Sequence, residues 1–120
     1  MPIQYLLDEN LPPLYREQLL RYKSDLVVRI IGDEGVLPTG TLDPEILCWC
    51  ENNGFLLVTN NRRSMPVHLA EHLEMGRHIP GILVLRRPVD IGRVLADLVL
   101  IAEAAEEDEY FDLISYVPLI

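Results

Sequence analysis

The sequence has few cysteines and no long apolar run, and each shortage narrows the classes of protein that it can encode. Its two cysteines among 120 residues, Cys48 and Cys50, are separated by one residue, so a disulfide framework is excluded and a reducing compartment is the simplest inference. No stretch of about 20 apolar residues occurs, and the first residues lack the basic region and apolar core of a secretory signal. We therefore expect a soluble, cytoplasmic protein with one domain and no membrane association.

Basic charge is also scarce, and acidic residues outweigh it. The 10 basic residues, nine of them arginine, face 19 acidic ones, which gives a net charge of −9. Residues 98–120 hold six acids and no base, so residues 1–97 carry only −3. An acidic surface repels phosphate backbones and disfavours non-specific nucleic-acid binding, although it does not exclude an enzyme whose acids surround a cation. The arginine pairs at 62–63 and 86–87 are suited to bidentate contacts with phosphate or carboxylate groups.

Short apolar runs alternate with helical patterns along the whole chain. The runs predict strands at residues 3–7, 26–31, 55–59, 81–85 and 110–117. Asn10, Asp43 and Asp90 are suited to cap the helices that follow them, and Gly54 is suited to end the second helix. Helices placed between continuously apolar strands indicate parallel pairing. The sequence thus predicts a three-layer α/β/α sandwich around a central, mainly parallel sheet of four to five strands.

Polar side chains are expected to gather at the carboxyl edge of this sheet, where open parallel sheets bind their ligands. Carboxylates brought together there repel one another, and a bound cation relieves the repulsion. Oxygen ligands suit Mg²⁺ or Mn²⁺, which can activate water and hold phosphate oxygens. The residues concerned end two strands or begin a helix: Asp8, Glu9, Asn10, Asp43, Thr59, Asn60, Asn61, Arg62 and Arg63.

Three motifs in residues 3–87 resemble the PIN-like domain family, whose relatives include the toxin ribonucleases of toxin–antitoxin pairs. They are LLDENLP at residues 6–12, DPEIL at 43–47 and GFLLVT at 54–59. The resemblance implies a metal-dependent nuclease fold in which Asp8 and Asp43 bind Mg²⁺ or Mn²⁺, with Glu9 as a further ligand. Where the family has T-x-D-x-D-F, this chain has TNNRRS, so Asn61 and Arg63 replace acids. Because an amide lacks charge and a guanidinium opposes a metal ion, nuclease-like architecture is expected more strongly than nuclease activity.

Two functions follow from this pattern. The first is a ribonuclease with an eroded metal site, the toxin half of a pair whose partner is an antitoxin-type small protein, with Asp8, Asp43 and Asn61 as catalytic residues. The second is a catalytically inactive module that acts through protein or RNA contacts. In either case the expected substrate contacts come from the residues beside the acids: Asn10, Thr59, Asn60, Arg62 and Arg63.

Simpler interpretations stand beside these. Asp43 is an excellent helix cap without any metal, and Asn60 and Asn61 suit a turn. Residues 68–72, HLAEH, match an inverted zinc-protease motif with both histidines on one helix face, but that motif needs a distant third ligand. Cys48 and Cys50 would point to opposite sides of a helix, which makes Cys50 a core residue.

The acidic end of the chain carries a further prediction. Four consecutive acids at 106–109 should end the last helix near Ala105 and lie in solvent as a turn. The apolar stretch at 110–117 is too large to stay uncovered. It can add an edge strand to its own sheet, or pair with a second copy in a homodimer, the outcome that we favour.

Overall fold

The computed structural model describes residues 2–120, and its five strands and four helices alternate along the chain. Each predicted strand is present, trimmed to four residues, and the helices fall where the periodicity placed them. In chain order the elements are β1 (Gln4–Leu7), α1 (Leu14–Tyr22), β2 (Val27–Ile30), α2 (Asp43–Asn53), β3 (Leu56–Thr59), α3 (Met65–Glu74), β4 (Ile82–Leu85), α4 (Ile91–Ala104) and β5 (Ile114–Val117).

The five strands form one sheet in the order β2-β1-β3-β4-β5, and every neighbouring pair is parallel. The fold is therefore α/β with a single parallel sheet, as predicted. All carboxyl ends lie at one edge of the sheet, and β1 and β3 are direct neighbours there. This order brings Asp8 beside Thr59, although the two are 51 residues apart in the sequence.

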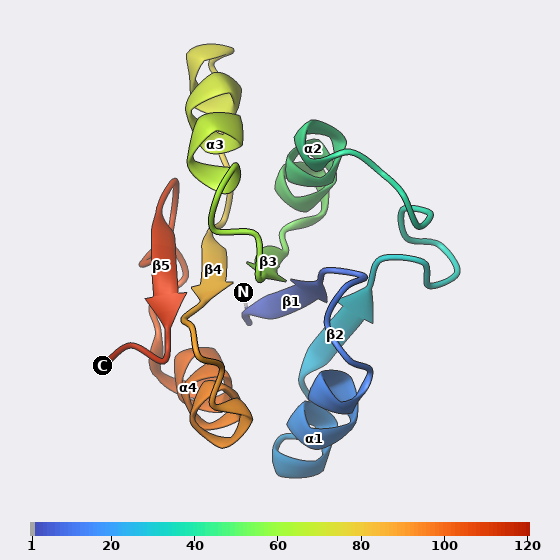
Figure 1. The fold of residues 1–120 in the computed structure, drawn as a ribbon, viewed down its shortest axis with the longest axis vertical. Helices are drawn as coiled ribbons and strands as arrows, with labels where there is room; N and C mark the ends of the chain where they lie inside the picture. Colours follow the sequence, from blue (N-terminus) through green and yellow to red (C-terminus); the bar gives the residue numbers. More distant parts are fainter. Residues whose placement is uncertain (1) are drawn as a thin grey trace.

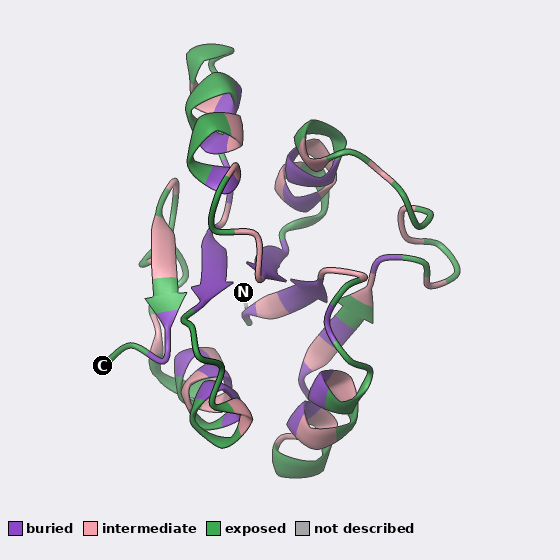
Figure 2. Ribbon diagram, viewed as in Figure 1, coloured by how far each residue is buried: buried purple, intermediate pink, exposed green. Residues whose placement is uncertain are grey.

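Two helices cover each face of the sheet, which gives the three layers seen in Figure 1. Side chains of α1 and α4 pack with one parity of the strands, and side chains of α2 and α3 pack with the other. The strands are almost wholly buried at the centre of the molecule and are more exposed at β2 and β5 (Figure 2). Two-sided burial explains why the strands are continuously apolar rather than alternating.

The residues at the N-termini of the helices show which of the predicted caps are present. The Asp90 carboxylate accepts the Arg93 backbone N–H at 3.2 Å and caps α4, as predicted. The predictions for Asn10 and Asp43 are wrong. The first helix begins only at Leu14, after Pro13, and in the second the extended backbone of Leu42 occupies the cap position. Asp43 therefore lies inside the first turn of α2, where its carboxylate is free to bind elsewhere.

At the acidic end, the predicted end of the last helix and the exposed turn of acids are confirmed, and the apolar stretch adopts the alternative that we did not favour, an edge strand of its own sheet. Helix α4 ends at Ala104, residues 106–113 form turns, and β5 adds an edge strand to its own sheet beside β4. Gly81, with φ +153°, lies so close to this segment that a Cβ would meet the Tyr110 carbonyl oxygen at 2.9 Å. The outer edge of β5 has no partner strand among residues 2–120, and the homodimer stays a prediction.

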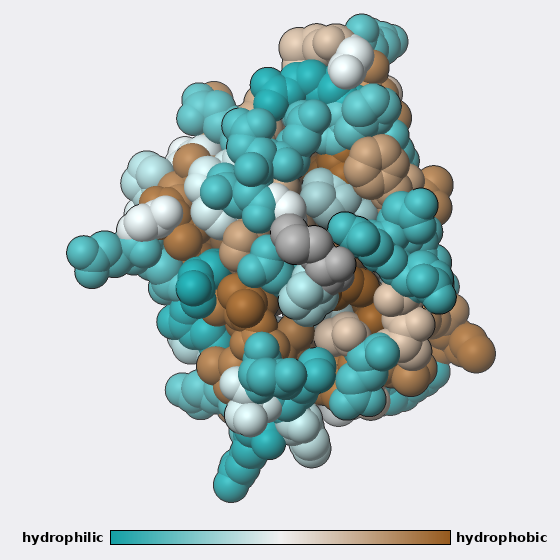
Figure 3. All heavy atoms as spheres, turned by 180° about the vertical axis from the view of Figure 1, so that it is seen from behind, coloured by the Kyte–Doolittle hydropathy of each residue, from teal (hydrophilic) through white to brown (hydrophobic). Residues whose placement is uncertain are grey.

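Hydrophilic side chains predominate on the face shown in Figure 3, and apolar side chains lie between them. None of the helices formed by residues 2–120 has the length and apolar character that a membrane span requires.

Candidate functional site

Asp8 stands at the carboxyl end of β1 and is bound to β3. Its backbone N–H donates to the Val58 carbonyl at 3.0 Å, which continues the parallel pairing one residue past the strand. The buried Thr59 hydroxyl donates to Asp8 Oδ2 at 2.8 Å. A threonine at the end of a fully buried strand needs such a partner, because an unpaired buried hydroxyl is costly. The side chains thus lock the ends of β1 and β3 together.

Asp43 turns its carboxylate toward the loop after β3. The Asn61 side-chain amide donates to Asp43 Oδ2 at 2.9 Å and to the Ser64 hydroxyl oxygen at 2.8 Å. The Ser64 backbone N–H donates in return to Asn61 Oδ1 at 3.3 Å. Asn61 is therefore more than a turn residue, since its amide links the start of α2 to the start of α3.

One chain of hydrogen bonds joins the predicted acids. The Asn61 backbone N–H donates to Thr59 Oγ1 at 3.1 Å, and Thr59 in turn donates to Asp8. With the bond from Asn61 to Asp43, these contacts form a continuous path, which we name the polar chain: Asp8, Thr59, Asn61 and Asp43. The structure thus brings Asp8 and Asp43 to one edge with Asn61 between them.

His68 is a member of this neighbourhood that the sequence reasoning missed. It lies one helical turn after Ser64 on α3, and its Nε2 is 3.5 Å from Asp43 Oδ2. Its Nδ1 is buried and has no hydrogen-bond partner within residues 2–120. The only sequence signal was its place in the HLAEH motif, which suggested a different chemistry.

Glu9 and Asn10 do not join the acids in the way that the sequence suggested. Glu9 Oε1 accepts the Gly40 backbone N–H at 2.8 Å, so its carboxylate holds the long loop between β2 and α2. Asn10 is exposed, and only its backbone N–H approaches Asp8, at 3.4 Å from Oδ1. The Glu9 carboxylate therefore binds the loop and not a shared cation site with Asp8.

Arginines lie directly beside the polar chain. A hollow of about 790 Å³ is lined by Asn60, Asn61, Arg62, Arg63 and Arg87. A second hollow of about 310 Å³ shares Arg62 and Arg87 with the first. We name the two hollows together the arginine groove, and its lining residues are Asn60, Asn61, Arg62, Arg63, Arg86, Arg87 and Tyr116.

The charge of the arginine groove is uncompensated. No hydrogen bond or ion pair joins the side chains of Arg62, Arg63 or Arg87 to any residue in the described range 2–120. Arg86 Nε donates to the Pro118 carbonyl at 2.5 Å, a neutral partner. No carboxylate lines either hollow. In a protein of net charge −9, four arginines gathered without an acid form a local site for anions.

The donor set fits a strongly bound divalent ion poorly. Across the described part of the chain, no three His, Cys, Asp or Glu side chains are grouped so that they could hold a metal ion. The third corner of the site is an amide that presents its N–H, not its oxygen, to Asp43. Three of the four arginine side chains of the neighbouring groove have no anionic or hydrogen-bonding partner among residues 2–120 and add repulsion toward a cation.

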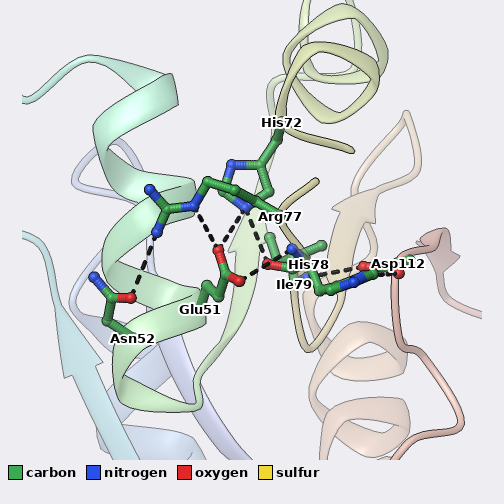
Figure 4. Close-up of polar contacts among 7 residues, drawn as sticks. All are labelled: Glu51, Asn52, His72, Arg77, His78, Ile79 and Asp112. Atoms are coloured by element: carbon green, nitrogen blue, oxygen red, sulfur yellow. Dashed lines mark hydrogen bonds and ion pairs between the residues drawn. The ribbon is translucent and has the colours of Figure 1, made fainter. Parts of the chain in front are cut away.

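The two histidines of the HLAEH motif have separate partners, one at each edge of the sheet. His72 is 2% exposed, and its Nε2 donates to Glu51 Oε1 at 3.1 Å and to the His78 carbonyl at 2.9 Å. Glu51 also accepts from Arg77 Nε at 2.8 Å and from the His78 backbone N–H at 3.1 Å (Figure 4). His78 Nδ1 continues the network to Asp112 Oδ2 at 2.8 Å. We name this network the Glu51 cluster: Glu51, His72, Arg77, His78 and Asp112.

Searches with protein-family models, among curated proteins and among solved structures found no significant match for the chain. The geometry of the carboxyl edge is therefore the basis for assigning a function.

Proposed function

We propose that the protein is a PIN-like module that binds RNA at the carboxyl edge of its sheet and does so without a metal ion. The observation that supports this most is the hollow of about 790 Å³ beside the polar chain, lined by three arginines and two asparagines. Guanidinium groups match phosphate oxygens in charge and in hydrogen-bond geometry. The Asn60 side chain supplies a donor and an acceptor for the sugars and bases between the phosphates, whereas the Asn61 amide is already bound to Asp43 and Ser64.

The overall acidity of the chain is compatible with this function because the charges are separated in space. The acidic residues 106–109 lie in the turn before β5, at the amino edge of the sheet. The arginines of the groove follow β3 and β4 at the carboxyl edge. Phosphates approaching the groove are therefore attracted locally, while the acidic edge disfavours non-specific binding elsewhere. RNA binding is therefore expected only at the carboxyl edge of the sheet.

The polar chain gives the groove a rigid floor. Asn61 lines the hollow and is held by Asp43, Ser64 and Thr59 through its amide and backbone. A loop fixed in this way loses little conformational entropy when its other residues bind a ligand. The acids Asp8 and Asp43 thus serve as positioning residues for the loop after β3 instead of metal ligands.

Fluorescence anisotropy with a labelled oligoribonucleotide in EDTA tests this function. Wild-type protein should bind at low salt, and the affinity should fall as salt rises because counterions are released. Arg63→Ser should weaken binding and reduce the slope of log K against log salt by about 0.7, the value of one phosphate contact on a single strand. The control is Arg21→Ser, which removes an exposed arginine of α1 and changes net charge equally.

Two results would overturn the proposal. Equal losses for Arg63→Ser and Arg21→Ser would mean that only net charge matters. Cleavage of the RNA on addition of Mn²⁺, abolished by Asp8→Asn, would establish the metal-dependent ribonuclease in its place.

A further inference from the structure

The two edge strands of the sheet differ in how they are protected from pairing with another chain. β2 carries an exposed charged residue, Arg29. The four residues of β5, ISYV, carry no charge, and this strand is more exposed than the central ones (Figure 2). Around it, Leu113, Tyr116 and Leu119 are each at least 39% exposed. An uncharged edge strand flanked by exposed apolar side chains is a ready site for pairing with a further strand.

The outward hydrogen-bonding groups of β5 belong to Ile114 and Tyr116. The carbonyls of Leu113 and Val117 accept backbone N–H groups from β4 and the residue after it, at 3.0 and 2.7 Å. Because the direction of these groups alternates along a strand, the N–H and C=O groups of Ile114 and Tyr116 point away from β4. No strand formed by residues 2–120 pairs with that side of β5.

A second copy of β5 matches these groups when it runs antiparallel, with Ser115 on the two-fold axis. Ile114 of one copy then lies opposite Tyr116 of the other, and the two residues exchange both of their N–H···O bonds. The axis repeats this pair on its other side, so that every outward group of the two residues is bonded. An aromatic and a β-branched side chain placed opposite each other on antiparallel strands also pack favourably.

The charges at the two ends of β5 favour this antiparallel arrangement. Four consecutive acids at 106–109 lie in the turn that leads into β5, and Asp112 follows them. At the other end of the strand lie Arg86 and Arg87, which follow the neighbouring strand β4. An antiparallel pair places the acidic end of each copy beside the basic end of the other, whereas a parallel pair would place acid beside acid.

We propose that β5 is the interface of a homodimer, in which a second copy of the chain pairs antiparallel with it and joins the two sheets into one. The hydrogen-bonding groups, the apolar side chains and the charges of this edge all match those of its own copy. The proposal is independent of the proposed function, because Ile114, Ser115 and Tyr116 do not line the hollow of about 790 Å³.

Sedimentation equilibrium and amide hydrogen exchange on the full chain test the dimer without any substitution. The mass should rise from 13.7 kDa toward twice that value as the protein concentration increases. The N–H groups of Ile114 and Tyr116 should exchange more slowly at concentrations where the dimer prevails, because they are then bonded to the second copy. The amides of β2, at the opposite edge of the sheet, should show no such dependence on concentration.

Ser115 offers the sharpest substitution, since it faces its own copy across the two-fold axis. Ser115→Lys and Ser115→Glu each place like charges opposite one another, and each should weaken dimerisation roughly tenfold or more at low salt. An equal mixture of the two variants pairs opposite charges and should restore the dimer. Ser24→Lys and Ser24→Glu, in the exposed turn before β2, change net charge equally and should leave dimerisation unchanged.

Three outcomes would overturn the proposal. The first is a chain that remains monomeric at every concentration, and the second is a dimer that both Ser115 variants form as tightly as the wild type. The third is a mixture of the two variants, each melting as the wild type does, that dimerises no better than either alone. If a Ser115 variant does not fold, the exchange of the Ile114 and Tyr116 amides in the wild type decides.

Discussion

The two edges of the sheet each carry a polar cluster that contains arginine, but the partners of the charged side chains differ between the two. In the Glu51 cluster at the amino edge, each charged side chain contacts a group of opposite charge, and His72 is buried among them. In the arginine groove at the carboxyl edge, three guanidinium groups have no partner within residues 2–120. Paired charges stabilise a fold, whereas like charges gathered without partners repel one another and are suited to binding an anionic ligand.

The position of each cluster in the fold agrees with this difference. Glu51 lies near the end of α2, His72 near the end of α3, and Asp112 just before β5, so the Glu51 cluster ties three elements together. Asp112 Oδ1 also accepts the Ile79 backbone N–H at 2.9 Å. Arg62, Arg63 and Arg87 instead lie on loops that follow β3 and β4, and their side chains join no other element among residues 2–120.

The largest expected effect comes from removing the centre of the paired cluster. Glu51→Gln replaces a carboxylate that accepts hydrogen bonds from Arg77, His72 and the His78 backbone. The buried His72 N–H then loses its charged partner, and the free energy of unfolding should fall by about 1–3 kcal/mol. Urea denaturation measures the change, and Glu74→Gln on the exposed face of α3 is the matched control.

The same variant should leave RNA binding intact under conditions where it is folded. Such a result would show that the Glu51 cluster at the amino edge contributes to stability and not to RNA binding. A loss of RNA affinity in folded Glu51→Gln, or a stability equal to that of Glu74→Gln, would contradict the distinction drawn between them.

The dependence of stability on pH tests the role of the Glu51 cluster without any substitution. Burial alone would raise the pKa of Glu51, but hydrogen bonds from the Arg77 side chain and the His78 backbone N–H hold the pKa below its ordinary value. Because the pKa of Glu51 is lower in the folded state than its ordinary value of 4.5, the ionised carboxylate stabilises the fold at pH values above 4.5. This contribution is lost as the pH falls through the lowered pKa of the folded state. The stability difference between wild type and Glu51→Gln should therefore shrink below pH 4.5.

Replacing Arg77 tests the cause of this pH dependence. In an Arg77→Gln background the guanidinium no longer favours the ionised Glu51, so the stability lost in acid should be smaller. Urea denaturation at a series of pH values measures it in both backgrounds. An identical acid loss with and without Arg77 would assign the effect to other carboxylates.

The sequence predicts what depends on local pattern and misses what depends on distant partners. The strands follow from apolar runs, and the Asp90 cap from a contact three residues away. The cap predicted at Asp43 is wrong because Leu42 occupies the cap position, and the Asp43 carboxylate instead binds Asn61, 18 residues away. No local signal records such a distant partner.

Strand order explains the other residues that the sequence reasoning left out of the site. Arg86 and Arg87 were visible as a pair, but Tyr116 joins them only because β5 pairs with β4. His68 was noted only as part of the HLAEH match, for which a zinc site was not favoured, and its actual neighbour, Asp43, lies on another helix. Packing of side chains from separate elements decides these contacts, and periodicity does not describe it.

The smallest expected effect concerns the metal site that the family resemblance implies. Wild-type protein should bind Mn²⁺ weakly, because its polar chain has two acids and the groove beside it is basic. Asn61→Asp with Arg63→Asp adds two carboxylates and removes one cation, so the affinity should rise roughly tenfold or more. Titration calorimetry on both proteins measures this rise.

A matched variant separates a local effect of these two substitutions from their effect on net charge. Asn53→Asp with Arg21→Asp makes the same charge change at exposed positions of other helices and should alter Mn²⁺ binding little. Because the substitutions at 61 and 63 convert an edge built for anions into one built for a cation, RNA affinity should fall as Mn²⁺ affinity rises. Equal Mn²⁺ affinities for the wild type and the protein substituted at 61 and 63 would mean that a metal ion does not use this edge at all.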